Sequence, residues 1–167
     1  GVYGSPLRIL DQLRRYQREG MAGWSKVRIV AHLFDAQKTK IDALKARLGE
    51  SDWNIPRVGI DLRAIEFKDA LDAHRSILEN SRAAKLLVID QFGVDEVPDD
   101  VFKKLIGFPT TDFIFFLSSS TLHRFRDHPA IKMKIGKPED SYDVHRAAVD
   151  YFRNLAPPHV FAAFFNQ

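Results

Sequence analysis

Apolar runs that suit β-strands recur along the chain. VRIVAHLF at 27–34 is β-branched and apolar at both odd and even positions, which predicts a strand covered on both faces. KLLVID at 85–90 and TDFIFFLSSS at 111–120 predict two more strands, of which the second is the most apolar. RVGIDLRAI at 57–65 alternates between apolar and polar positions and is a weaker strand candidate.

Segments with apolar residues at helical spacing separate these strands. The first helix is expected to begin at Ser5-Pro6, where the serine hydroxyl can accept a hydrogen bond from a free amide, and to end at Gly20. A second helix is expected at 36–49, with Gly49 as its left-handed C-cap. The apolar positions of these two helices are Leu7, Leu10, Leu13, Tyr16, Ile41, Leu44 and Leu48.

Three further helices are predicted in the rest of the chain. They cover 66–81, 100–107 and 139–155, and Asp99 or Asp100 is expected to cap the second of them. A basic loop interrupted by proline is expected at 121–137, and the tail at 159–167 is a candidate for another strand. The positions expected to face inward from the first and last of these helices are Phe67, Leu71, His74, Leu78, His145, Val149 and Phe152.

The alternation of strands and helices predicts an α/β protein. Parallel strands need crossover connections, so the expected fold is Rossmann-like, with a doubly wound, mostly parallel sheet flanked by helices. A chain of 167 residues is expected to form one such domain. Ligands of these sheets bind outside the carboxyl ends of the strands, and we expect a shared rim there. The candidate rim residues are Asp35, Glu66, Asp90 and Ser118 to Ser120.

Three acids at this rim each allow a functional and a structural interpretation. Asp90 follows four aliphatic residues in LLVIDQFG, and Gly93 permits close backbone approach to a ligand, but an acid also ends a strand as a turn former. Asp35 suits the hydroxyl groups of a ribose, or it caps the next helix. Glu66 stands at a helix start, where interaction with the helix dipole is sufficient to explain it.

Composition narrows the class of protein. The chain has no cysteine, which excludes a disulfide framework, thiolate metal ligands and a cysteine nucleophile, and fits the reducing cytoplasm. No apolar run approaches the ~20 residues that a membrane span needs. The formal net charge is +3, and its distribution is uneven, because the segment 121–137 holds five cations against the single acid Asp127. Its cations Arg124, Arg126, Lys132, Lys134 and Lys137 suit a nucleic-acid backbone or an anionic cofactor, or form a solvated loop.

Several common motifs are absent from the sequence. No G-x-G-x-x-G and no G-x-x-x-x-G-K-[ST] occurs, and no nucleophile elbow surrounds the serines at 118–120. His123 and His128 are five residues apart across a proline-containing loop, which is not a metal-ligand spacing, so we predict no metal site. His74 and His145 lie on apolar helix faces and are expected to be core residues.

Four segments resemble, in this order, the three-Cys-motif partner proteins of bacteria: YGSPLRIL, IDQFGVDEVP, TDFIFFLSSSTLHRF and HRAAVDYFRNL. The resemblance spans most of the chain. It implies a class I, Rossmann-type methyltransferase that uses S-adenosylmethionine. It also implies a partner, because genes of this family commonly lie beside the gene of a three-cysteine-motif, radical-SAM-like protein in phage-related settings.

The resemblance assigns roles to particular residues. Asp35 would hold the ribose of S-adenosylmethionine, Glu66 would stand near the adenine, and Gly4 and Ser5 would complete the cofactor site. The catalytic set would be Asp90, Gln91, Phe92 and Gly93, beside the methyl group.

The chain departs from the family in two respects. Gln91 replaces the proline of the family's motif, and the first strand and glycine-rich loop expected before GSPL are missing, so we expect a truncated or divergent short member. The alternative function is a catalytically inactive module that binds a partner protein or nucleic acid.

Overall fold

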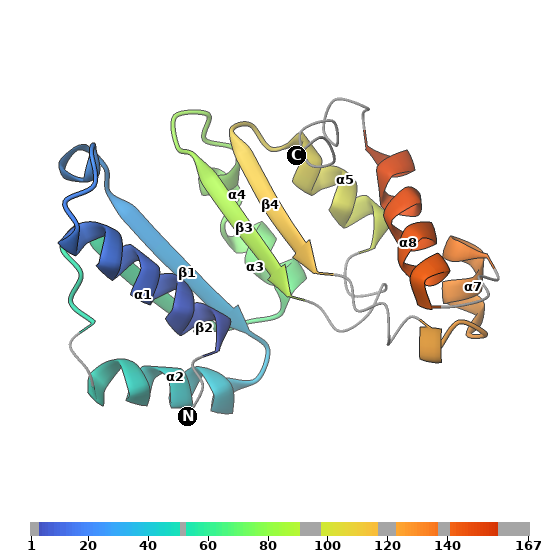
Figure 1. The fold of residues 1–167 in the computed structure, drawn as a ribbon, viewed down its shortest axis with the longest axis horizontal. Helices are drawn as coiled ribbons and strands as arrows, with labels where there is room; N and C mark the ends of the chain where they lie inside the picture. The colour runs from blue at the N-terminus through green and yellow to red at the C-terminus, as the bar shows by residue number, and fades with distance from the viewer. Residues whose placement is uncertain (1–3, 51–52, 91–97, 117–122, 137–140, 157–167) are drawn as a thin grey trace. The chain divides into compact units, whose positions relative to one another are not determined.

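The structure is a computed structural model that describes residues 4–50, 53–90, 98–116, 123–136 and 141–156. The chain divides into two compact units, Gly1–Ala73 and His74–Gln167. Each unit holds a pair of parallel strands and helices that connect or cover them (Figure 1). The predicted mixed α/β class is therefore confirmed.

The first unit is built around the strands β1 and β2. Its elements are α1 (Ser5–Arg18), a 3-10 turn (Trp24–Lys26), β1 (Ile29–Asp35), α2 (Lys38–Glu50), β2 (Val58–Ala64) and α3 (Phe67–Ala73). The strands pair in parallel, from Ile29 opposite Val58 to Asp35 opposite Ala64. Because parallel strands cannot be joined by a tight turn, α2 makes the crossover between them.

The core of the first unit lies on one face of the β1–β2 pair. Its buried residues are Leu7, Leu10, Trp53 and Ile55. Residues from α1, α2 and both strands pack against this cluster: Leu13, Leu44, Leu48, Ala31, Leu33, Val58 and Ile60. In a strand, alternate side chains point to the same face, so the face that bears Ala31 and Leu33 is the one that α1 and α2 cover. The Arg14 guanidinium stacks over the Trp53 ring, 4.6 Å from its centroid.

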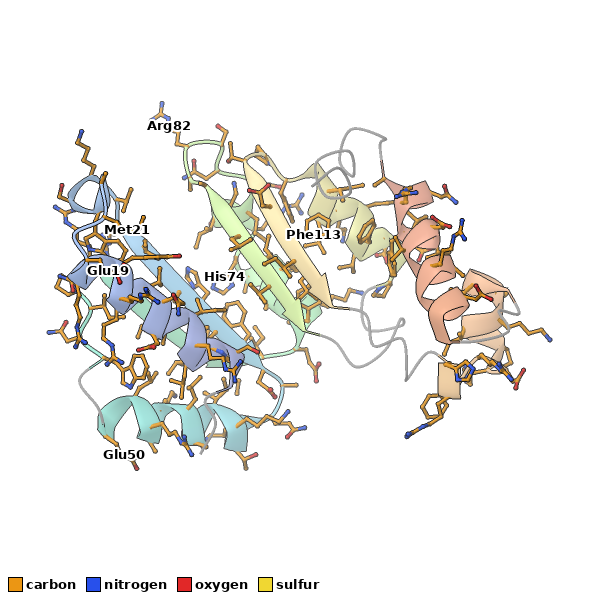
Figure 2. All side chains as sticks on the ribbon, viewed as in Figure 1. Glu19, Met21, Glu50, His74, Arg82 and Phe113 are labelled. Carbon is orange, nitrogen blue, oxygen red and sulfur yellow. The ribbon has the colours of Figure 1, made fainter. Side chains whose placement is uncertain are left out.

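The ends of α1 confirm one sequence expectation and correct another. Gly20 has φ +63°, its amide donates to the Gln17 carbonyl, and the Met21 amide donates to the Tyr16 carbonyl, so the helix ends in a Schellman motif. Figure 2 shows Glu19 and Met21 at this end. At the other end, Gly4 is the N-cap and Ser5 is the first helical residue, so the predicted serine cap is wrong.

The second unit is built around β3 and β4. Its elements are α4 (Arg75–Leu78), β3 (Lys85–Asp90), α5 (Asp99–Gly107), β4 (Thr111–Phe116), α7 (Pro129–Ile135) and α8 (Ser141–Leu155). The strands pair in parallel, from Lys85 opposite Thr111 to Asp90 opposite Phe116. The crossover between them contains α5, and α7 packs against α8. Figure 1 shows this pair of helices side by side.

An aromatic cluster forms the core of the second unit. Phe102 of α5 is almost fully buried, and its ring centroid lies 5.8 Å from that of Phe113 and 5.0 Å from that of Phe152. Phe113, labelled on β4 in Figure 2, thus joins the sheet to α5, and Phe152 joins α8 to α5. The Tyr151 hydroxyl also donates a hydrogen bond to Asp99, which connects α8 to the start of α5.

The sheet arrangement confirms only part of the fold prediction. All four strands are parallel to their neighbours, as predicted, but each sheet of the described chain has two strands, so a continuous doubly wound sheet is not confirmed. The apolar pattern identifies a strand without saying which edges pair, which is why strand content was more predictable than sheet size.

Four further element predictions need correction. The N-cap of α5 is Pro98, so neither Asp99 nor Asp100 caps this helix. The helix expected at 66–81 is divided at His74 into α3 and α4. Gly49 lies inside α2 and does not cap it. The segment 121–137, expected to be a loop, contains α7, because Pro129 occupies the first helical turn, where proline loses no hydrogen bond. The strand candidate at 159–167 lies outside the described residues.

Candidate functional site

The carboxyl edge of the β1–β2 pair brings two predicted site residues together. Asp35 is the last residue of β1, and its carbonyl accepts a hydrogen bond of 3.0 Å from the amide of Ile65, one residue past the end of β2. Glu66 is the next residue. Because the two strands run in the same direction, Asp35 and Glu66 lie at one edge of this sheet, as their positions in the sequence predicted.

The Asp35 carboxylate is held in a defined position. Its Oδ1 accepts a hydrogen bond of 2.8 Å from the Gln37 amide, and its Oδ2 lies 3.2 Å from the Lys40 ammonium. The first contact is an Asx turn onto Gln37, whose carbonyl accepts from the Ile41 amide at the start of α2. Gln37 is therefore the residue at the N-cap position, and the expectation that Asp35 caps this helix is wrong. A carboxylate offers about four acceptor positions, and these two contacts leave room for further donors. The side chain is 33% exposed, so such donors can reach it from solvent.

Glu66 stands at the start of α3. Its carbonyl accepts a hydrogen bond of 2.9 Å from the Ala70 amide, which makes Glu66 the residue that precedes the first helical turn. The residue is exposed. A negative charge at this position interacts favourably with the helix dipole, and the same exposure leaves the carboxylate accessible to a ligand.

The residues assigned to catalysis belong to the second unit. Asp90 ends β3, opposite Phe116 of β4, so its position at the carboxyl end of a parallel strand is confirmed. Gln91, Phe92 and Gly93 lie outside the described residues, as do the serines at 118–120.

Gly4 and Ser5 mark the start of α1. Gly4 is the N-cap, with φ −68° and ψ 169°, and no side chain caps this helix end. Both residues are exposed. Their part in cofactor binding stays a prediction.

In the described part of the basic segment, Arg124 and Arg126 precede α7, and Lys132 and Lys134 belong to it. Lys137 lies outside the described residues. Arg124 and Lys132 are exposed. Arg126 Nη1 lies 3.1 Å from Nε2 of His123. An arginine can only donate, so this nitrogen of His123 is the acceptor of the hydrogen bond.

A polar cluster on the β1–β2 pair was missing from the sequence predictions. His32 and Asp61 are opposite each other in the register, and His32 Nδ1 lies 3.0 Å from Asp61 Oδ2. The Arg63 guanidinium reaches the same carboxylate, with its Nε 3.2 and 3.0 Å from the two oxygens. These three side chains lie on the sheet face opposite to Ala31 and Leu33.

The cluster has a clear electrostatic effect. Hydrogen bonding from Arg63, and less strongly from His32, holds the pKa of Asp61 below its ordinary value, although partial burial acts in the other direction. An ionised carboxylate can only accept, so the His32 Nδ1 carries the hydrogen of the shared bond. One indication of this cluster was present in the sequence, since His32 is a polar residue inside the apolar run at 27–34.

Of the two histidines that were expected to be core residues, His74 is buried. His74, labelled in Figure 2, is 7% exposed and lies between α3 and α4. Of the other residues on the predicted stripe, Leu78 is buried, whereas Phe67 and Leu71 are half-buried. Ala70, which is outside the predicted stripe, is buried as well. The side chain of His145 lies outside the described side chains.

Comparison with known proteins gives no family assignment. No protein-family model matches the chain, and searches of curated proteins and of solved structures gave no significant match. A membrane span is also missing from the described part of the chain, since none of its helices combines the required length and apolar character.

Proposed function

We propose that this protein is an S-adenosylmethionine-dependent methyltransferase-like protein that acts with a three-cysteine-motif partner. The observation that carries the proposal is the meeting of Asp35 and Glu66 at the carboxyl edge of two parallel strands joined by α2. Carboxylates at this edge of an α/β sheet are suited to the hydroxyl groups of a nucleoside. The resemblance of YGSPLRIL, IDQFG and TDFIFFLSSS to the partner family supports the choice of cofactor.

The residues at this edge fit a nucleoside by their chemistry. Asp35 is oriented by the Gln37 amide and keeps acceptor positions for ribose hydroxyls. Glu66 is exposed beside it and can accept from an exocyclic amino group. S-adenosylmethionine, when bound, supplies a methyl group activated by its sulfonium. The family resemblance, and not the geometry of the first unit, is what assigns Asp90 to the transfer step, as the residue that would orient the acceptor's N–H or O–H.

Calorimetric titration with S-adenosylmethionine tests the binding step. Asp35→Asn keeps an acceptor for the Gln37 amide but removes the charge, and Glu66→Gln makes the same change at the second position. Loss of a charged hydrogen bond is worth about 1.5–3 kcal/mol, so each variant should bind roughly 10- to 100-fold more weakly. Asp42→Asn, an exposed acid on α2 paired with Lys38, is the matched control and should bind as the wild type.

Two results would remove the proposal. One is the absence of measurable binding by the wild-type protein, and the other is equal affinity of Asp35→Asn, Glu66→Gln and the control. Transfer is measured separately, with a radiolabelled methyl group and fractionated nucleic acid and protein as acceptors. Asp90→Asn should keep cofactor binding and lose transfer. Co-purification with a co-expressed three-cysteine-motif protein tests the partner.

A further inference from the structure

A short basic segment of the second unit exposes apolar side chains among its cations. Phe125 is 52% exposed and Met133 is 87% exposed, whereas the phenylalanines of the core, Phe102 and Phe152, are almost fully buried. Phe125 stands between Arg124 and Arg126, and Met133 stands between Lys132 and Lys134. An exposed aromatic ring between two arginines suits a partner that has both flat rings and negative charge.

The backbone holds this segment as one piece. The His128 amide donates to the Phe125 carbonyl at 2.9 Å, and the Lys132 amide donates to the His128 carbonyl at 2.9 Å. On α7, Ile131 and Ile135 are four residues apart and both are buried, so they form the inward face of the helix. Lys132 and Met133 are therefore on the outer side, and α7 itself is fixed against α8.

We propose that residues 123–135 bind single-stranded nucleic acid. Phe125 stacks on a base, and Arg124 and Lys132 contact phosphates. The segment holds four arginine and lysine residues against one carboxylate, Asp127, which gives the charge complementarity that a polyanion requires. Arg126 is partly held by His123, so Arg124 and Lys132 are the exposed cations among the described side chains of this segment.

The same observations favour nucleic acid over an anionic membrane. A membrane-surface helix turns a continuous apolar face outward. Here the two isoleucines of α7 point inward, and Met133 is left beside a lysine. Stacking needs one exposed ring and nearby cations, which the segment has. This inference does not rest on cofactor binding by the first unit.

Fluorescence anisotropy with a labelled 15-nucleotide single strand of mixed sequence tests the proposal, using the full chain. Phe125→Ala should weaken binding about 5- to 100-fold, the range for loss of one stacked base. Phe125→Trp keeps an aromatic ring at this position and should bind as tightly as the wild type. The slope of log K against log salt is negative, and Arg124→Ala and Lys132→Ala should each make it less steep by about 0.7, as expected for loss of one phosphate contact to a single strand. Arg82→Ala is the control, because Arg82 is an exposed arginine on the loop before β3, where Figure 2 labels it.

Three outcomes would overturn the proposal. The first is no binding of the single strand at low salt. The second is equal affinity of Phe125→Ala, Phe125→Trp and the wild type, which would leave a solvated basic turn. The third is binding to vesicles of phosphatidylserine and phosphatidylcholine without binding of the oligonucleotide, which would make the segment a membrane contact.

Discussion

The two parallel strand pairs of this protein differ in the side chains on the sheet face opposite their apolar core. On β1 and β2, that face bears His32, Asp61 and Arg63, joined by hydrogen bonds, between the apolar residues Val30 and Phe34. On β3 and β4, it bears Leu86, Val88 and Ile114 together with the exposed Asp112 opposite Leu86, and the exposed fractions of Leu86 and Ile114 are 63% and 53%. The covered faces are alike, since both are apolar and packed against helices.

The difference shows that the solvent-accessible face of a two-stranded sheet can carry either paired polar side chains or exposed aliphatic ones. Polar side chains opposite each other in the register satisfy one another and tolerate water, as the His32–Asp61 pair does. Exposed aliphatic side chains make no hydrogen bonds to water. A cluster of them, such as Leu86, Val88 and Ile114, favours association with other surfaces. The covered faces should therefore contribute most of the stability of each unit, and the open faces should contribute little.

The largest effect is expected from the covered face of the β3–β4 pair. Phe102→Ala removes the ring that contacts both Phe113 and Phe152, and it should lower the free energy of unfolding by about 3–5 kcal/mol. Urea denaturation followed by circular dichroism measures this change. Phe125→Ala makes the same substitution at an exposed ring and should cost at most about 0.5 kcal/mol. Similar losses in the two variants would show that the aromatic cluster does not hold this unit together.

A smaller effect is expected from the polar face of the β1–β2 pair. Asp61→Asn should cost about 1 kcal/mol or less at pH 7, because the cluster is partly exposed. The pKa of Asp61 is lowered in the folded protein, so the stabilisation is present above the ordinary aspartate pKa of 3.8 and is lost as the pH falls through the lowered value. Denaturation midpoints at pH 7, 5 and 3 should therefore show the wild type approaching the variant as the pH falls.

Asp72→Asn, an exposed acid on α3, serves as the control for this pH series. Its midpoints should follow the wild type at every pH. A difference between wild type and Asp61→Asn that stays constant from pH 7 to pH 3 would mean that the carboxylate charge does not stabilise the cluster.

The smallest effect on stability is expected from the open face of the β3–β4 pair. Leu86→Thr should change the free energy of unfolding by no more than about 0.5 kcal/mol, because the side chain is already in water. It should also reduce self-association, measured by static light scattering, since it interrupts an apolar surface. Ile89→Thr, on the covered face, should cost clearly more. A large loss in Leu86→Thr would show that something covers this face.

Local sequence pattern predicted much of the secondary structure. β3 has the bounds predicted from KLLVID, and the helical repeats placed α1, α2 and α8 within a few residues. The errors occur where one residue type has two uses. Pro129 looked like an interruption but begins α7, and Ser5 looked like a cap although Gly4 takes that position. Backbone conformation at such points depends on neighbouring structure that propensity alone does not include.

The candidate site was predictable to the extent that it depends on strand direction. Asp35 and Glu66 follow two strands joined by a helix, and parallel pairing alone places them at one edge. The His32–Asp61 contact depends on register, and the two residues are 29 positions apart in the sequence. A shift of one residue would move Asp61 to the other face, so no local pattern could have identified this pair.

The placement of the aromatic residues has a consequence for spectroscopy. The chain contains two tryptophans, Trp24 and Trp53, and both belong to the unit Gly1–Ala73. Intrinsic tryptophan emission therefore reports on that unit alone, and the Arg14 guanidinium over the Trp53 ring makes this signal sensitive to loss of the local packing. Comparing the emission with an ellipticity signal from both units would reveal whether they melt in one cooperative step or in two.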